Sequence, residues 1–214
     1  SLSPHGKTTM SPELFELQVR DGAWAITAAN VHQARVMRDS GVPRVLIANE
    51  VAAPGDIGWL GEQVDAGFPV VCYVDSVAGV RLLADGLTAR GVAGRLGVLV
   101  ELGVTGGRTG VRSLDDALEV ARAAADSPVL AVAGVSGFEG IITATDAATA
   151  EERVDEFLDR LATLAERIVG DGLATGTDEF VVSAGGSVFF DRVVDRLTRV
   201  RAPMPNRVVL RSGC

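Results

Sequence analysis

Lys7 is the only lysine of the chain, and every other cationic residue among its 20 Lys and Arg is an arginine. A lysine amine can form a Schiff base with a carbonyl compound, whereas an arginine guanidinium stays protonated and cannot. Lys7 also lies in a turn of small residues, Pro4-His5-Gly6-Lys7-Thr8-Thr9, and not on a charged helix face. The sequence therefore predicts a functional amine at Lys7. A leftover surface lysine is the alternative.

Two glycine-containing turns could bind an anion. Gly185-Gly186-Ser187 follows an apolar run, and Gly213 follows Arg211 after the last such run. Glycines let backbone amides approach a phosphate closely, and a helix N-terminus favours negative charge. Glycine turns also occur in loops that bind no ligand, so two such turns together are better evidence for an anion site than either one alone. With the Lys7 amine, they suggest pyridoxal phosphate as a cofactor.

Two arginines could act on such a cofactor. Arg108 lies in the Gly- and Thr-rich frame Gly106-Gly107-Arg108-Thr109-Gly110, and Arg211 ends the last apolar run. An arginine at the pyridine nitrogen or the phenolic oxygen would set the electronics of the cofactor ring. As surface residues, these arginines would need no such explanation.

Short apolar runs alternate with stretches of helical period along the whole sequence. The runs are rich in Val, Leu and Ile without strict alternation, which is typical of strands buried on both faces of a parallel sheet. They are Ala23–Ala29, Arg44–Asn49, Val70–Asp75, Arg95–Glu101, Leu130–Phe138, Phe180–Ala184 and Arg207–Arg211. The segment that ends at Lys7 adds an eighth strand position. This pattern predicts one α/β domain, a (β/α)8 TIM-type barrel, with a doubly wound open sheet as the alternative.

Helices are expected between the runs, each after a polar residue or along an apolar face. The expected helices are Val31–Ser40 after Asn30, Val77–Arg90 after Ser76, Leu114–Asp126 after Ser113, Ala147–Gly170, and Val188–Val200 after Ser187. Barrel enzymes carry their active sites on the loops that follow the strands. The candidate residues fall on such loops, so we expect them to converge.

Composition excludes several classes of function. The net charge of −8 and the isoelectric point near 4.8 argue against nucleic acid or an anionic membrane as a partner. Two cysteines and two histidines give neither a disulfide framework nor metal-ligand spacing, so no metal ligand is assigned. Without a signal peptide or a long apolar segment, we expect a soluble, cytoplasmic protein.

Taken together, these segments resemble the fold-type III pyridoxal-phosphate enzymes, which share the alanine racemase N-terminal barrel. Within them the chain is most similar to the D-threonine aldolase and D-serine dehydratase branch. The matching segments are Pro4-His5-Gly6-Lys7-Thr8, Gly22–Thr27, Leu46–Glu50, Val74-Asp75-Ser76, Gly107–Val111, Gly137-Phe138-Glu139-Gly140 and Arg211-Ser212-Gly213-Cys214. They follow the order of the family along the whole chain.

The resemblance implies a role for each candidate residue. Lys7 would be the Schiff-base lysine and a base at the substrate α-carbon, Arg108 would approach the phenolic oxygen, and Arg211 would face the pyridine nitrogen. Phe138 stands where the family often has tyrosine, so it could stack on the ring but offers no phenol. The implied phosphate-binding loops contain Ser183, Gly185, Gly186, Ser187, Gly213 and Cys214.

The resemblance also implies an activity, a lyase acting on β-hydroxy D-amino acids by aldol cleavage or by dehydration. An amino-acid racemase and a non-catalytic pyridoxal-phosphate carrier are the alternatives. Family members carry a C-terminal β-domain with a divalent-metal site, which residues 1–214 do not match, so the sequence looks like an excised barrel domain. A homodimer is expected, because relatives often dimerise near the active site.

Overall fold

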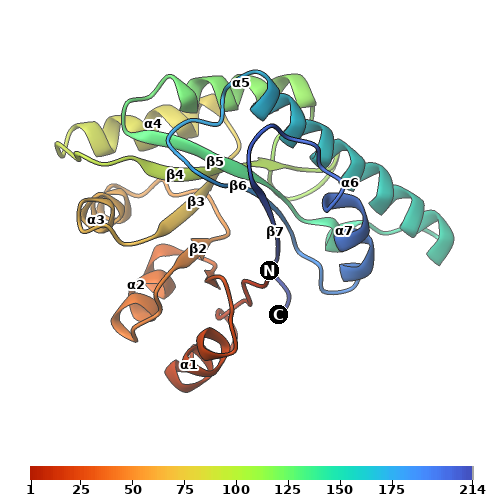
Figure 1. Ribbon diagram of the computed structural model, residues 1–214, viewed down its shortest axis with the longest axis horizontal. Helices are drawn as coiled ribbons and strands as arrows, with labels where there is room; N and C mark the ends of the chain where they lie inside the picture. The colour runs from red at the N-terminus through yellow and green to blue at the C-terminus, as the bar shows by residue number, and fades with distance from the viewer. Residues whose placement is uncertain (214) are drawn as a thin grey trace.

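The computed structural model describes residues 1–213, and its centre is one curled, parallel seven-stranded sheet (Figure 1). The strands pair in sequence order, each with the next, and all pairs are parallel. They are β1 (Ile26–Ala28), β2 (Val45–Ile47), β3 (Val70–Val74), β4 (Leu96–Leu102), β5 (Leu130–Gly137), β6 (Phe180–Ala184) and β7 (Asn206–Leu210). Each strand falls within one residue of a predicted apolar run. The expectation of a parallel α/β fold is therefore confirmed.

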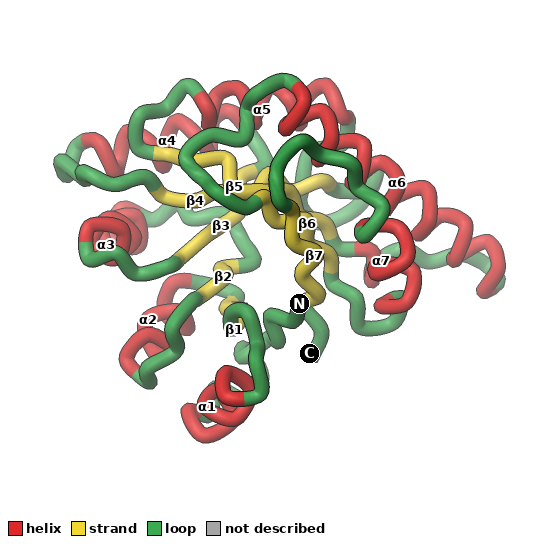
Figure 2. The backbone as a smooth tube through the Cα atoms, in the orientation of Figure 1, coloured by secondary structure: helices red, strands yellow, loops and turns green. Residues whose placement is uncertain are grey.

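Helices cover the outer face of the sheet (Figures 1 and 2). They are α1 (Pro12–Arg20), α2 (Val31–Asp39), α3 (Pro54–Asp65), α4 (Val77–Thr88), α5 (Leu114–Ala125), α6 (Ala147–Gly170) and α7 (Phe190–Leu197), with a short 3-10 helix η1 (Glu139–Ile141) after β5. None of the helices in residues 1–213 combines the length and apolar character that a membrane span requires. Helices α1 and α3 were not among the helices expected from the sequence.

Side-chain caps start three helices where the sequence predicted them. The side chains of Asn30, Ser76 and Ser113 accept hydrogen bonds from backbone amides in the first turns of α2, α4 and α5. The prediction was wrong for α7. That helix begins at Phe190 without a side-chain cap, so Ser187 belongs to the loop before it.

The N-terminal segment lies between the two edges of the sheet. It forms no strand, but Leu2 makes a parallel bridge to Leu210 of β7 and His5 makes one to Thr27 of β1 (Figure 2). The amide of Ser3 donates to the Leu210 carbonyl at 2.8 Å, and the amide of Thr27 donates to the Pro4 carbonyl at 2.8 Å. The sheet is thus curled like part of a TIM-type barrel, and the predicted first strand is present as an extended segment with isolated bridges.

Two apolar clusters fill the two sides of the sheet. The larger cluster packs the outer side of the strands against the helices. The smaller cluster contains one residue from each strand or its entry: Ala25, Leu46, Tyr73, Leu99, Ala133, Val181 and Val209. Because side chains alternate along a strand, this inner set comes from the opposite face to the helix-packed set. It forms the apolar interior beneath the loops that follow the strands.

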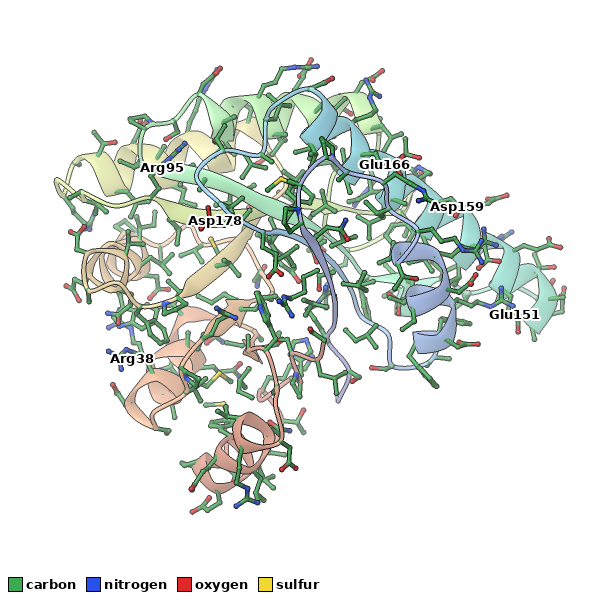
Figure 3. All side chains as sticks on the ribbon, in the orientation of Figure 1. Arg38, Arg95, Glu151, Asp159, Glu166 and Asp178 are labelled. Carbon is green, nitrogen blue, oxygen red and sulfur yellow. The ribbon has the colours of Figure 1, made fainter. Side chains whose placement is uncertain are left out.

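Charged side chains join the two last helices. Asp155 of α6 accepts hydrogen bonds from Arg192 and Arg196 of α7, each at 2.7 Å, and Arg196 also pairs with Asp159 at 3.0 Å. Arg192 pairs in addition with Glu151, and Figure 3 labels Glu151 and Asp159 along the same side of α6. This network fixes α7, and with it the loop that leaves β6.

The hydroxyl of Thr27 should stabilise the attachment of the N-terminal segment. It donates to the Ser3 carbonyl at 2.7 Å and contacts the Ser3 hydroxyl at 2.8 Å, and both residues are fully buried. Thr27→Val keeps the volume and removes both bonds, so we expect a loss of about 1–3 kcal/mol in the free energy of unfolding. Urea denaturation measures it. Thr88→Val, at an exposed position of α4, is the control, and an equal effect of the two substitutions would contradict the prediction.

Candidate active site

A cavity of about 350 Å³ opens where the strands end. Six of the residues predicted for the site line it: Lys7, Arg108, Phe138, Gly185, Ser187 and Arg211. They come from the N-terminal segment and from the loops after β4, β5, β6 and β7. Parallel strands bring their carboxyl ends to one edge, so residues far apart in sequence share one wall. The size suits a small organic ligand.

Four predicted residues are not on the cavity wall. Ser183 is fully buried beneath it, and Gly186 and Gly213 are not among the lining residues. Cys214 lies outside the described residues. The cofactor contacts assigned to these four stay predictions.

Arg211 is held by three bonds from the strand ends around it. One guanidinium nitrogen donates to the hydroxyls of Ser136 at 2.8 Å and Ser183 at 2.7 Å, and the other terminal nitrogen donates to the Gly137 carbonyl at 2.7 Å. Arg211 is only 5% exposed, and its guanidinium lies 5.5 Å from the ring centre of Tyr73. Ser183 therefore contacts Arg211, a role that sequence reasoning had not given it.

Three cavity residues carry buried polar atoms without a hydrogen-bond partner in the described part of the chain. They are the Nδ1 of His5, the hydroxyl of Tyr73 and the Nε of Arg211. Only two other buried side-chain polar atoms in residues 1–213 share this property, and their residues do not line the cavity. Buried polar groups are nearly always satisfied, by protein, water or ligand. The clustering fits a site built for a polar ligand.

His5 is a neutral imidazole at neutral pH. Burial is the largest cause that lowers its pKa from 6.5 to about 4, and the positive charges of Arg211 and Lys7 contribute to the same shift. The backbone amide of His5 donates to the Ser212 carbonyl at 3.0 Å, which places His5 beside the end of β7. The sequence alone left two roles open for His5, a contact with the cofactor and a structural role in the turn.

Glu101 is a buried carboxyl of the cavity that sequence reasoning missed. It is 8% exposed, and the Thr109 hydroxyl donates to it at 2.9 Å. Burial raises its pKa, whereas the Thr109 bond and the charges of Arg211 and Arg108 oppose that rise. The signal was present in the sequence, because Glu101 is an acidic residue inside an otherwise apolar strand.

Asn49, Tyr73 and Thr109 also line the cavity, and none had been predicted to do so. Tyr73 occurs in an apolar run that looks like ordinary strand sequence, so its contact with the cavity depends on the strand register.

The glycine turn after β6 has an internal partner. The amides of Gly185 and Gly186 donate to the two carboxylate oxygens of Glu139, at 3.0 and 2.5 Å. Glu139 is fully buried and is not a lining residue of the cavity. The prediction that these amides bind a phosphate directly is untested, and both already have an acceptor.

No group of three or more His, Cys, Asp or Glu side chains within residues 1–213 lies close enough together to hold a metal ion.

Comparison with known proteins gives one consistent group of relatives, although no family model matches the chain. The chain is 28% identical to the 3-hydroxy-D-aspartate aldolase of Paracoccus denitrificans (strain Pd 1222), over 87% of this chain and 48% of the relative. It is 27% identical to the D-threonine aldolase of an Arthrobacter species, over 100% of this chain and 64% of the relative. It thus spans between about half and two thirds of the length of these relatives.

Solved structures agree with the sequence matches. The D-threonine aldolase of Filomicrobium marinum superposes with a TM-score of 0.76 at 25% identity, over 99% of this chain and 53% of that chain. A metal-free mutant of D-threo-3-hydroxyaspartate dehydratase gives a TM-score of 0.74 at 25% identity, over 97% of this chain and 52% of that chain. The homologues of this chain are therefore D-threonine aldolase and the 3-hydroxy-D-aspartate aldolases and dehydratase, fold-type III pyridoxal-phosphate enzymes of the alanine racemase-like family.

Proposed function

We propose that this chain binds pyridoxal phosphate and is the barrel part of a lyase acting on β-hydroxy D-amino acids. The observation that carries the proposal is the cavity itself, which brings the only lysine together with three unsatisfied buried polar atoms. Its relatives are named as aldolases and a dehydratase acting on D-threonine and 3-hydroxy-D-aspartate, both kinds of lyase.

Bound pyridoxal phosphate would draw electrons away from the substrate α-carbon, so that a bond to that carbon can break. Lys7 would supply the amine that holds the cofactor, and the same amine would move a proton at the α-carbon. Arg211, already fixed by three bonds, would offer its free Nε to the pyridine nitrogen. Because an arginine is a poor proton donor, that nitrogen would stay unprotonated.

The other wall residues would orient the ligand and exclude water. Arg108 would contact the phenolic oxygen, Phe138 would stack on the ring, and Ser187 would contact the phosphate. Glu101, whose pKa is raised by burial, takes up a proton at higher pH than an exposed carboxyl does. It is therefore suited to exchange a proton with a ligand hydroxyl.

We further propose that residues 1–6 act as an eighth strand, so that residues 1–214 form a closed (β/α)8 barrel domain. Their backbone bonds to both β7 and β1 support this. The resemblance to the family is the support for three other properties: a C-terminal β-domain, a divalent-metal site in that domain and a homodimer. A cytoplasmic location stays an expectation from the sequence.

Absorption spectroscopy tests the cofactor and its lysine. Wild-type protein that is mixed with pyridoxal phosphate and dialysed should keep a visible absorption band. Lys7→Ala and Lys7→Arg should both lose it, because neither side chain offers a free amine to the cofactor aldehyde. Lys7→Ala combined with Arg20→Lys restores a lysine on the exposed end of α1 and should also lack the band. A band in any of the three variants would contradict the assignment of Lys7.

Product analysis tests the reaction class. With D-threonine, D-serine or 3-hydroxy-D-aspartate, the cofactor-loaded protein should release either glycine and an aldehyde, or a keto acid and ammonia. The matching L-amino acids should not react. The same assay with an added chelator tests for the proposed metal. Formation of the L-amino acid alone would indicate a racemase, and binding without turnover would indicate a carrier. Either result would overturn the lyase proposal.

The pH dependence of stability tests the environment of His5. Its pKa is about 4 in the folded protein and 6.5 without the fold. Between these values the unfolded chain binds a proton that the folded chain does not, so stability falls as the pH is lowered from about 6.5 to 4. In urea titrations, we expect the free energy of unfolding of His5→Gln to fall less over this range than that of wild type. The slope of this free energy against pH should be smaller by an amount that corresponds to at most about one bound proton. His32→Gln, on the exposed surface of α2, is the control, and equal slopes for wild type and His5→Gln would contradict the prediction.

A further inference from the structure

The turn after β6 is built around a carboxylate of the chain itself. Gly186 has a φ of +69°, a conformation that lets successive backbone amides converge on one anion. The anion found there is the side chain of Glu139, whose two oxygens each accept one amide, from Gly185 and Gly186. The site that the sequence suggests for a ligand phosphate is therefore occupied from within.

Glu139 has no other strong partner within residues 1–213. It is fully buried, and no ion pair joins it to a lysine or arginine among the described residues. Burying a carboxylate costs free energy unless it is hydrogen-bonded, so Glu139 needs these two amides as partners. The two amides in turn need Glu139 as their acceptor. Displacing it would leave the carboxylate in the interior without the two backbone donors that it accepts from. This favours a permanent bond over one that opens for a ligand.

The turn is also held from its other sides. A side chain at Gly185 would approach the Phe138 ring to 2.5 Å, and the Gly185 carbonyl accepts a bond from the Arg211 amide at 3.1 Å. Phe138 and Glu139 are consecutive residues at the end of β5, so the loop after β5 contacts the loop after β6 through both side chains. These contacts restrict the conformation of the turn.

That shape decides where the next residue lies. Gly185 and Ser187 line the cavity, whereas Glu139 does not, so its carboxylate lies behind the turn. We infer that Glu139 is a positioning residue for the cofactor phosphate. Its carboxylate permanently occupies the amides of Gly185 and Gly186 and so fixes Ser187 and the following loop, where the phosphate binds. The inference rests on the proposed cofactor and revises the expectation that those two amides contact the phosphate.

The test compares a ligand that carries the phosphate with one that lacks it. Pyridoxal phosphate and pyridoxal are titrated into wild type and Glu139→Gln, and the absorption of the lysine adduct gives each Kd. In Gln an NH2 group, which donates and does not accept, replaces one of the two carboxylate oxygens, so one backbone amide loses its partner and the turn loosens. We expect the Kd for pyridoxal phosphate to rise about tenfold or more, as for the loss of a charge-assisted hydrogen bond, and the Kd for pyridoxal to change little. General damage to the barrel would weaken both ligands equally.

Two further variants keep the result decisive. Glu156→Gln makes the same change on the exposed surface of α6 and should leave the ratio of the two Kd values unchanged. Glu139→Asp keeps the charge but is too short to reach both amides, so it should lower the phosphate preference in the same direction. It replaces Glu139→Gln in the test if the latter does not fold.

The outcomes separate the inference from the proposed function. Absence of an adduct in wild type with either ligand would remove the cofactor proposal itself. An adduct in wild type with an unchanged ratio in the Glu139 variants would overturn only the positioning role. A stronger preference for the phosphate in those variants would also overturn it, because Glu139 would then compete with the phosphate for the amides.

Discussion

The buried guanidinium of Arg211 connects most of the features of the site. It follows β7 and bonds to residues of β5 and β6, so it ties three neighbouring strand ends together. No ion pair to a carboxylate neutralises it within residues 1–213, and its charge therefore acts on its neighbours. It contributes to the low pKa of His5 and opposes the rise of the Glu101 pKa. The cavity is thus more cationic than the acidic protein around it, which favours anionic ligands.

The positions of the strands could be predicted because buried strands have recognisably apolar sequences. Strands covered on both faces must be apolar throughout, and all seven runs of this kind became strands. Two helices were not predicted, and for α3 there is a physical reason. The α3 segment contains Gly55, Gly58 and Gly61, which weaken helix propensity, and its helical state depends on packing against the sheet. The start of α1 at Ser11 and Pro12 was the more readable of the two signals.

The site could be predicted only in outline. Parallel strands must bring their carboxyl ends together, which is why Lys7, Arg108 and Arg211 could be expected in one place. The partners that hold them could not be foreseen. The bonds between Ser183 and Arg211 and between Glu139 and the glycine turn join loops from neighbouring strands, so they depend on register and on side-chain direction. The spacing of residues along one sequence shows neither the strand register nor the side-chain direction.

The pairing of the N-terminal segment with β7 places a condition on the order of folding. The amino group of Ser1 donates to the carbonyl of Val208, a contact across 207 positions of sequence, and His5 is joined to Ser212. Contacts of such long range carry the largest loop-closure cost and slow folding. During synthesis, residues 1–6 cannot make these contacts until β7 and Ser212 have left the ribosome. Lys7 therefore reaches its place among the wall residues only after β7 has formed, and a chain that lacks β7 does not present the amine in its site.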